Sequence, residues 1–201
     1  MSATAAPVIG LAAAPALAVT TWTVKPGGTV TGTAGKTVVT DVTKGQSVPC
    51  TSSVATGTLK SGRGLAGAGI GTITSFAFKG CNVSGFNVSV KLTGKMALNA
   101  VSYNATTKVA SMTITKIHGT ISVPAPISCS ATIDGTGATA HNGMVKATFT
   151  NGTDTLKVLA TGGNLHLYNP SSGCNGLISN KDAVNFIGGY KFSPKTTITS
   201  P

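Results

Sequence analysis

Alternation of apolar and polar residues with a period of two is the feature that most limits the folds open to this chain. It is clearest from Phe86 to Leu92, where every second residue is apolar and the residues between are Asn, Ser and Lys. Successive side chains of a β-strand point to opposite faces, so this pattern predicts half-buried strands. No segment sustains the 3.6-residue period of an amphipathic helix, and we expect little helix.

Similar alternation recurs along most of the chain. We expect further strands at 29–31, 36–42, 70–78, 96–103, 109–117, 144–149, 155–159, 164–168, 183–187 and 189–192. Hairpin turns are expected at 104–108 and at 150–154, where Asn151-Gly152 is a strong turn signal. Many strands separated by Gly-rich turns predict an all-β protein, either an antiparallel sandwich or a flattened barrel.

Four cysteines predict two disulfide bonds. Their number is even and no C-x-x-C pair occurs, which favours disulfides over a zinc site, and three pairings are open. A faint duplication guides the choice, because each half carries a Cys and, further on, a Gly-Cys-Asn sequence. Pairing within each half favours Cys50–Cys81 and Cys129–Cys174. The halves would be 19–107 and 108–201, or parts of one continuous domain.

The first eighteen residues are almost wholly small and apolar and end in Ala16-Leu17-Ala18. An A-x-A sequence of this kind is typical of a signal-peptidase cleavage site. We therefore interpret residues 1–18 as the remnant of a signal peptide and expect a secreted, extracellular protein. The alternative is a disordered or buried N-terminal segment.

The charge balance is strongly one-sided: fifteen Lys plus Arg stand against four acidic residues, all Asp, for a net charge of +11. Most acid–base and metal-dependent enzymes need carboxylates, so their scarcity disfavours such chemistry. A positive field suits attachment to anionic cell-envelope polymers or lipids; the alternative is that lysines only keep strand edges soluble. Specific nucleic-acid recognition is not expected, because the lysines are dispersed and the chain has one Arg and one Trp.

Few residues suggest a catalytic or binding site. Asp134 precedes His141 by seven residues in a loop and could form the acid–histidine part of a Ser-His-Asp triad, although no Gly-x-Ser-x-Gly motif is present. The alternative is two ordinary turns. Arg63, in the Gly-rich segment 62–71, is the candidate for ligand binding through its side chain and neighbouring amides. Three isolated histidines and no Glu predict no metal site, and no cofactor is expected.

Four short segments carry a resemblance to a known group of proteins. They are Trp22-Thr-Val-Lys-Pro-Gly-Gly, Cys50-Thr-Ser-Ser-Val-Ala-Thr-Gly-Thr-Leu-Lys-Ser-Gly, Gly69-Ile-Gly-Thr-Ile and Lys157-Val-Leu-Ala-Thr-Gly-Gly-Asn-Leu-His. Together they make residues 20–198 resemble a group of secreted actinobacterial proteins without an established activity. The resemblance implies export and a β fold, and it implies no catalytic residues.

The sequence thus predicts a secreted, non-enzymatic binding or structural protein, retained at the cell envelope by its positive charge. Two alternatives remain at this point. One is a secreted hydrolase that uses Asp134 and His141, and the other is a membrane-inserted β-barrel or pore, since alternating strands are typical of such barrels.

Overall fold

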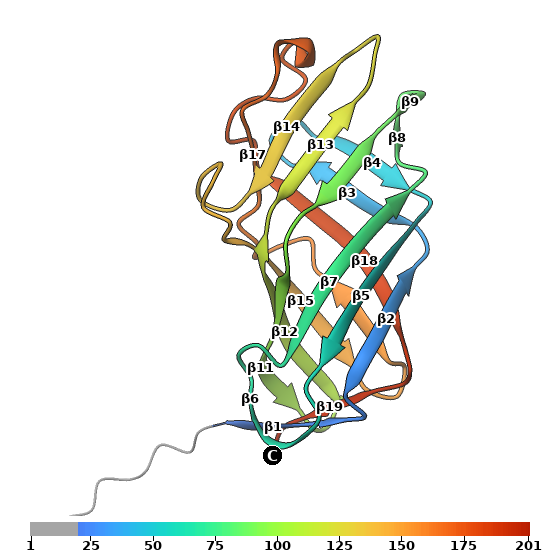
Figure 1. Cartoon of the computed structure of the whole chain (residues 1–201), viewed down its shortest axis with the longest axis vertical. Coiled ribbons are helices and arrows are strands. Elements are labelled where there is room, and N and C mark those ends of the chain that lie inside the picture. The colour runs from blue at the N-terminus through green and yellow to red at the C-terminus, as the bar shows by residue number, and fades with distance from the viewer. Residues whose placement is uncertain (1–19) are drawn as a thin grey trace, which may run out of the picture.

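The computed structural model describes residues 20–201 (Figure 1), so the expected signal remnant at 1–18 lies outside the described residues. In that range the chain forms strands and a single short 3-10 helix, η1 (Ser172–Cys174), which confirms the low helix content. The strands are β1 (Thr21–Lys25), β2 (Gly28–Ala34), β3 (Thr37–Asp41), β4 (Gln46–Cys50), β5 (Ser52–Leu59), β6 (Gly62–Ala66), β7 (Gly71–Lys79), β8 (Asn82–Val83), β9 (Phe86–Asn87), β10 (Ser89–Leu92), β11 (Met96–Asn104), β12 (Val109–Ile117), β13 (Gly119–Val123), β14 (Cys129–Asp134), β15 (Gly143–Thr150), β16 (Thr155–Val158), β17 (His166–Tyr168), β18 (Val184–Ser193) and β19 (Thr197–Thr199).

Eight antiparallel strands close into a barrel. Their order is β7-β11-β12-β15-β16-β18-β2-β5, and β5 pairs with β7 again to complete the circle. Closure satisfies the backbone groups that an open sheet would leave at its edges. Of the two all-β architectures predicted from the sequence, the structure is therefore the barrel.

The barrel interior follows from the period-two alternation. In β15, Val145, Ala147 and Phe149 are buried while the residues between them are more exposed. The neighbouring β12 does the same with Met112 and Ile114. Each strand therefore turns one apolar face inward, and these faces together form a single core.

The sheet continues beyond the closed barrel, so the molecule is elongated along the barrel axis (Figure 1). Strands β10, β13, β14 and β17 follow β7 in order at one end. On the other side, β18 changes partner: Lys191–Ser193 pair with β2, whereas Val184–Ile187 pair with β3, which pairs in turn with β4. One strand thereby joins the lower barrel to the upper part.

A separate three-stranded sheet, β19-β1-β6, lies across the lower end of the barrel (Figure 1). It places Trp22, Val24 and Ile198 in the core, where each is at most 1% exposed. The side chain of Asn151, from the 150–154 hairpin, holds this sheet by bonding both backbone groups of Ile198. The lower end of the barrel is therefore covered by packed side chains.

Both disulfides have the pairing favoured by the sequence. Cys50 bonds Cys81, and Cys129 bonds Cys174, with sequence separations of 31 and 45 residues. The barrel mixes strands from 19–107 and 108–201, since β11 pairs with β12 and β2 with β18. Within residues 20–201, no helix is long and apolar enough to cross a bilayer.

Candidate functional site

The structure brings Asp134 and His141 together at the end of β14. The Asp134 side chain is fully buried and accepts hydrogen bonds from three backbone amides: Gly135 N at 2.7 Å, His141 N at 3.0 Å and Asn142 N at 3.2 Å. This carboxylate therefore folds the loop 134–142 back on itself. A buried carboxylate that accepts hydrogen bonds from several backbone amides regains much of the stabilisation that it loses when it leaves water.

The imidazole of His141 lies beside the same carboxylate, with Nδ1 3.4 Å from Asp134 Oδ2. Its side chain is 58% exposed, and its ring lies 4.1 Å from the ring of His118, measured between centroids. The arrangement supplies an acid–histidine pair that solvent can reach. Among the hydrogen bonds of residues 20–201, none joins a Ser or Thr hydroxyl to the His141 ring, so the nucleophile of a triad is not in place there.

The third histidine is more enclosed than a solvent-facing strand residue. His166 sits opposite Asp134 in the β14–β17 pairing, and its Nδ1 lies 2.8 Å from Asn164 O and 3.1 Å from Gly135 O. Because both partners are carbonyl oxygens, Nδ1 must carry the proton. The Tyr168 hydroxyl donates to the same Gly135 oxygen at 2.8 Å. Although the histidines gather around one loop, no group of three potential metal ligands forms in the described part of the chain.

Arg63 lies elsewhere, on β6 in the sheet that covers the lower end of the barrel. Its side chain is exposed, and it forms no ion pair with a described carboxylate. The structure thus places the candidate ligand-binding arginine on a different element from Asp134 and His141.

Sequence reasoning missed a second acidic pair, formed by Asp41 and Asp182. Both are buried, and 141 positions separate them in the chain, so no local motif could reveal the pair. Burial raises the pKa of Asp41, and the neighbouring Asp182 carboxyl raises it further. The Lys44 amide, which donates to Asp41 Oδ1 at 2.9 Å, opposes the shift.

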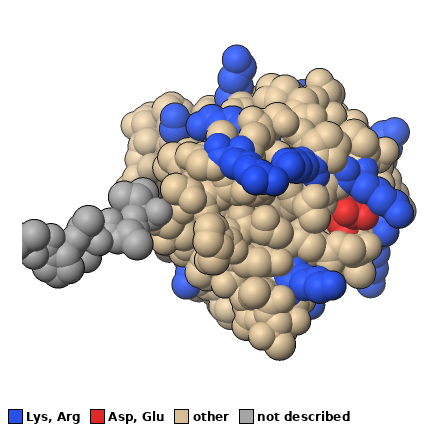
Figure 2. Space-filling model, turned by 90° about the horizontal axis from the view of Figure 1, so that it is seen from below, with Lys and Arg blue, Asp and Glu red and all other residues tan. Residues whose placement is uncertain are grey.

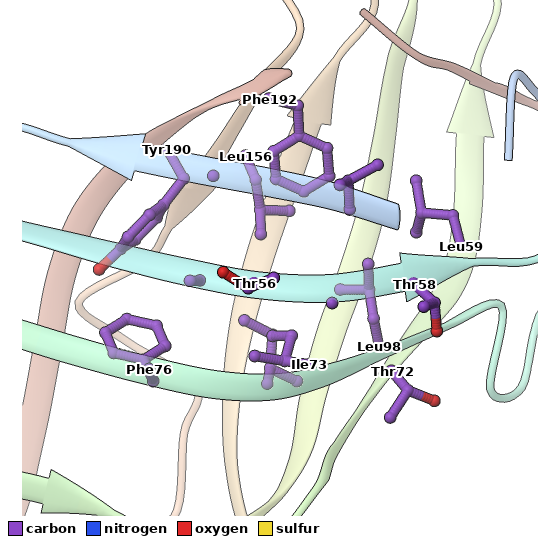
Figure 3. Close-up of a pocket in the computed structure, with 15 residues that line it drawn as sticks. Thr56, Thr58, Leu59, Thr72, Ile73, Phe76, Leu98, Leu156, Tyr190 and Phe192 are labelled. Carbon is purple, nitrogen blue, oxygen red and sulfur yellow. The ribbon is translucent and has the colours of Figure 1, made fainter. Parts of the chain in front are cut away.

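Two small apolar cavities of about 30 and 40 Å³ lie inside the barrel, and a third of about 80 Å³ lies in the upper part of the molecule, lined mainly by strands outside the barrel such as β3, β4 and β13. Figure 3 shows the lowest, into which Phe76 from β7 and Tyr190 and Phe192 from β18 project. The Tyr190 hydroxyl bonds Ser53 Oγ at 2.7 Å in a buried pair, and burial raises the pKa of this tyrosine far above its ordinary value. The linings of the two cavities inside the barrel offer almost no polar groups, so they suit aliphatic or aromatic groups, whereas Asp41, Gln46 and Ser122 also line the third cavity.

The surface of the protein is more one-sided in charge than its composition alone predicts. All four Asp side chains are buried, whereas all fourteen Lys and the one Arg are exposed. Within residues 20–201, no Lys or Arg nitrogen lies within ion-pair distance of a carboxylate. Figure 2 shows the basic side chains spread over the lower face, beside a single small acidic area. The positive charges are therefore presented to solvent without neutralising partners.

Fold and surface together define a disulfide-bonded, closed antiparallel β-barrel with a cationic exterior. Comparison with protein-family models, curated proteins and solved structures finds no match to this chain.

Proposed function

We propose that this protein is a secreted, non-enzymatic binding module that attaches to arrays of phosphate groups at the cell envelope. The observation that carries the proposal is the contrast between fifteen exposed cationic side chains and four buried carboxylates. The two disulfides support an oxidising, extracellular setting, in which structural disulfides persist.

The physical basis of attachment is long-range attraction and release of counterions. A surface with one sign of charge attracts polyanions from a distance, and each lysine that neutralises a phosphate releases a bound cation. Dispersed lysines act as point charges without the fixed fork geometry of arginine, so they favour a charged polymer over a single shaped anion. Attachment of this type weakens steeply as salt concentration rises.

Binding to two sources of phosphate tests the proposal. Soluble poly(glycerol phosphate) is titrated into the protein, and in parallel the protein is co-sedimented with vesicles of anionic or neutral phospholipid. We expect tight binding at low salt to one or both anionic probes and none to neutral vesicles. Preference for the polymer identifies a wall polymer as the partner, and preference for anionic vesicles identifies lipid headgroups. Binding to neutral vesicles as tight as binding to the anionic probes would contradict the proposal.

Matched variants separate charge from other surface effects. Lys60→Gln, Lys79→Gln and Lys91→Gln together remove three exposed positive charges. Each lost phosphate contact is expected to reduce the slope of log affinity against log salt by roughly 0.7. The control carries glutamine at three exposed neutral positions, Ser75, Ser89 and Thr120, and should bind as the native protein does.

A secreted hydrolase is the second candidate function, favoured by the 3.4 Å approach of His141 Nδ1 to Asp134 Oδ2. The non-enzymatic proposal predicts that the native protein and His141→Ala hydrolyse a nitrophenyl ester equally slowly. The exposed His141 ring can be removed without disturbing the hydrogen bonds that Asp134 accepts from three backbone amides. A fall of about a hundredfold or more in the variant would establish general-base catalysis instead.

A further inference from the structure

Strands continue above the closed barrel on both sides of the molecule (Figure 1). One side consists of β10, β13, β14 and β17, and the other consists of β3 and β4. Residues near the start of β18 join the two sides. The Leu167 amide of β17 donates to Asp182 O at 2.8 Å, and Val184 of β18 pairs with Asp41 of β3. The two sides therefore enclose a space instead of lying apart.

Both disulfides lie at the margins of this space. Cys50–Cys81 joins the end of β4 to the residue that precedes β8, and Cys81 O accepts the Val88 amide at 2.9 Å. Cys129–Cys174 joins β14 to η1, and Cys174 O accepts the Leu177 amide at 2.8 Å. The segments that carry Val88 and Leu177 are thus each held to a strand by a covalent bond, so their positions do not depend on side-chain packing alone.

The 80 Å³ cavity in this space, which we call the upper cavity, extends from the core to the surface. Its inner wall includes the buried Leu167 and Val184, whereas the exposed Gln46 and Leu177, which is 45% exposed, lie at its outer end. Other apolar lining residues are half-buried, namely Val83, Val123, Ile127 and Ile178. The mouth of the upper cavity is therefore bordered by apolar side chains that meet water, which is unfavourable unless a ligand covers them.

Few polar groups face the upper cavity. Asp41 and Gln46 lie opposite each other in the β3–β4 pairing, and Ser122 is the third polar residue of the lining. No Lys or Arg of residues 20–201 is among its lining residues. An anionic group inside would therefore lose its water without gaining an opposite charge. The lining suits a hydrocarbon group, and a charged or strongly polar group belongs outside the mouth.

We infer that the upper cavity binds the end of an unbranched alkyl chain whose polar head stays outside the mouth. The size favours a chain over a ring: a cavity of about 150 Å³ holds benzene, so one of about 80 Å³ fits roughly three or four carbons in a line. The chain end lies against Leu167 and Val184, and the methylenes behind it cover Leu177 at the mouth. Burial of apolar area drives this binding, so it does not depend on the lysines that the proposed function uses.

Uncharged glucosides that differ only in the tail test the inference. Binding of methyl, n-hexyl and cyclohexyl β-glucoside, below micelle-forming concentrations, is followed by the methyl chemical shifts of Ile127, Leu167 and Leu177 in the full chain. We expect no detectable binding of the methyl compound, and n-hexyl binding that is the same at low and high salt. Cyclohexyl has as many carbons as hexyl but is wider, and it should bind at least fivefold more weakly. Equal affinities for these two tails, or shifts only at residues outside the upper cavity, would overturn the inference.

Two pairs of variants locate the site. Val123→Trp places a ring in the mouth from β13 and should weaken n-hexyl glucoside binding about tenfold or more. Its control, Val101→Trp, carries the same ring at a 59% exposed position of β11 and should bind as the native protein does. Native-like affinity in a folded Val123→Trp would overturn the inference.

The second pair tests the mouth without filling it, and it decides the question if Val123→Trp does not fold. Leu177→Asp replaces an exposed apolar side chain at the mouth by a charged one and should weaken n-hexyl glucoside roughly threefold or more. Val101→Asp makes the same kind of change away from the mouth and should have no effect on binding. Equal affinities in these two aspartate variants would overturn the inference.

Discussion

Burial changes the proton affinity of a carboxyl group in this protein. Asp41 is 8% exposed, its Oδ2 meets no donor within residues 20–201, and Asp182 lies nearby. Burial and the like charge raise the pKa of Asp41 above its ordinary value of 3.8. The folded protein therefore holds a proton on Asp41 more tightly than the unfolded chain does.

We predict that Asp41→Asn raises the melting temperature at pH 7 and leaves it nearly unchanged at about pH 3.5. A raised folded pKa gives stability that is present below the unfolded pKa and is lost as pH rises through the folded pKa. Asparagine keeps the oxygen that accepts the Lys44 amide and has no charge to lose. Thermal unfolding followed by circular dichroism across this pH range measures the effect. The same difference in melting temperature between the variant and the native protein at both pH values would show that charge is not its cause.

Sequence reasoning at this scale could find Asp134 and His141, because seven residues separate them and a single loop joins them. It could not find Asp41 with Asp182, or the enclosure of His166, because pairing between distant strands creates those contacts. The position of a single polar residue on a strand does not indicate which side chains the neighbouring strand will place beside it.

At the scale of elements, local turns could be read and distant pairings could not. The turns at 104–108 and 150–154 connect β11 to β12 and β15 to β16, as their turn residues predicted. Closure of β11 on β7 and the change of partner along β18 had no such signal. Both depend on how the whole sheet curves, which short-range alternation does not encode.

Asn151 has a role beyond its turn, and we predict that Asn151→Ala lowers the free energy of unfolding by about 2–4 kcal/mol. Its Nδ2 donates to Ile198 O, and its Oδ1 accepts from Ile198 N, each at 2.8 Å in a buried position. Alanine leaves both backbone groups of β19 without these partners. Denaturant unfolding measures the loss, and hydrogen exchange at Ile198 should become faster.

Asn104→Ala is the matched control for this prediction, since Asn104 also lies at a hairpin turn. Its Oδ1 accepts only the Thr107 amide, at 2.9 Å, in an exposed position. We expect a loss of about 1 kcal/mol or less, because water can replace that bond. Equal losses in the two variants would mean that Asn151 does not anchor the sheet at the lower end of the barrel.

At the scale of the whole molecule, the distribution of charge distinguishes this barrel. The sequence predicted a positive net charge and dispersed lysines, but not the burial of every carboxylate. Each carboxylate is buried in a local arrangement of its own; Asp134, for example, accepts hydrogen bonds from three amides of its loop. Its consequence is global, because the exposed charged side chains of residues 20–201 are all cationic and none is in an ion pair with the four Asp.

The most direct test is the affinity for poly(glycerol phosphate) as a function of salt concentration. A cationic exterior that attaches by releasing counterions predicts a straight, steep fall of log affinity with log salt, shallower in the triple lysine variant. An affinity that stays constant from low to physiological salt, in either protein, would contradict the account.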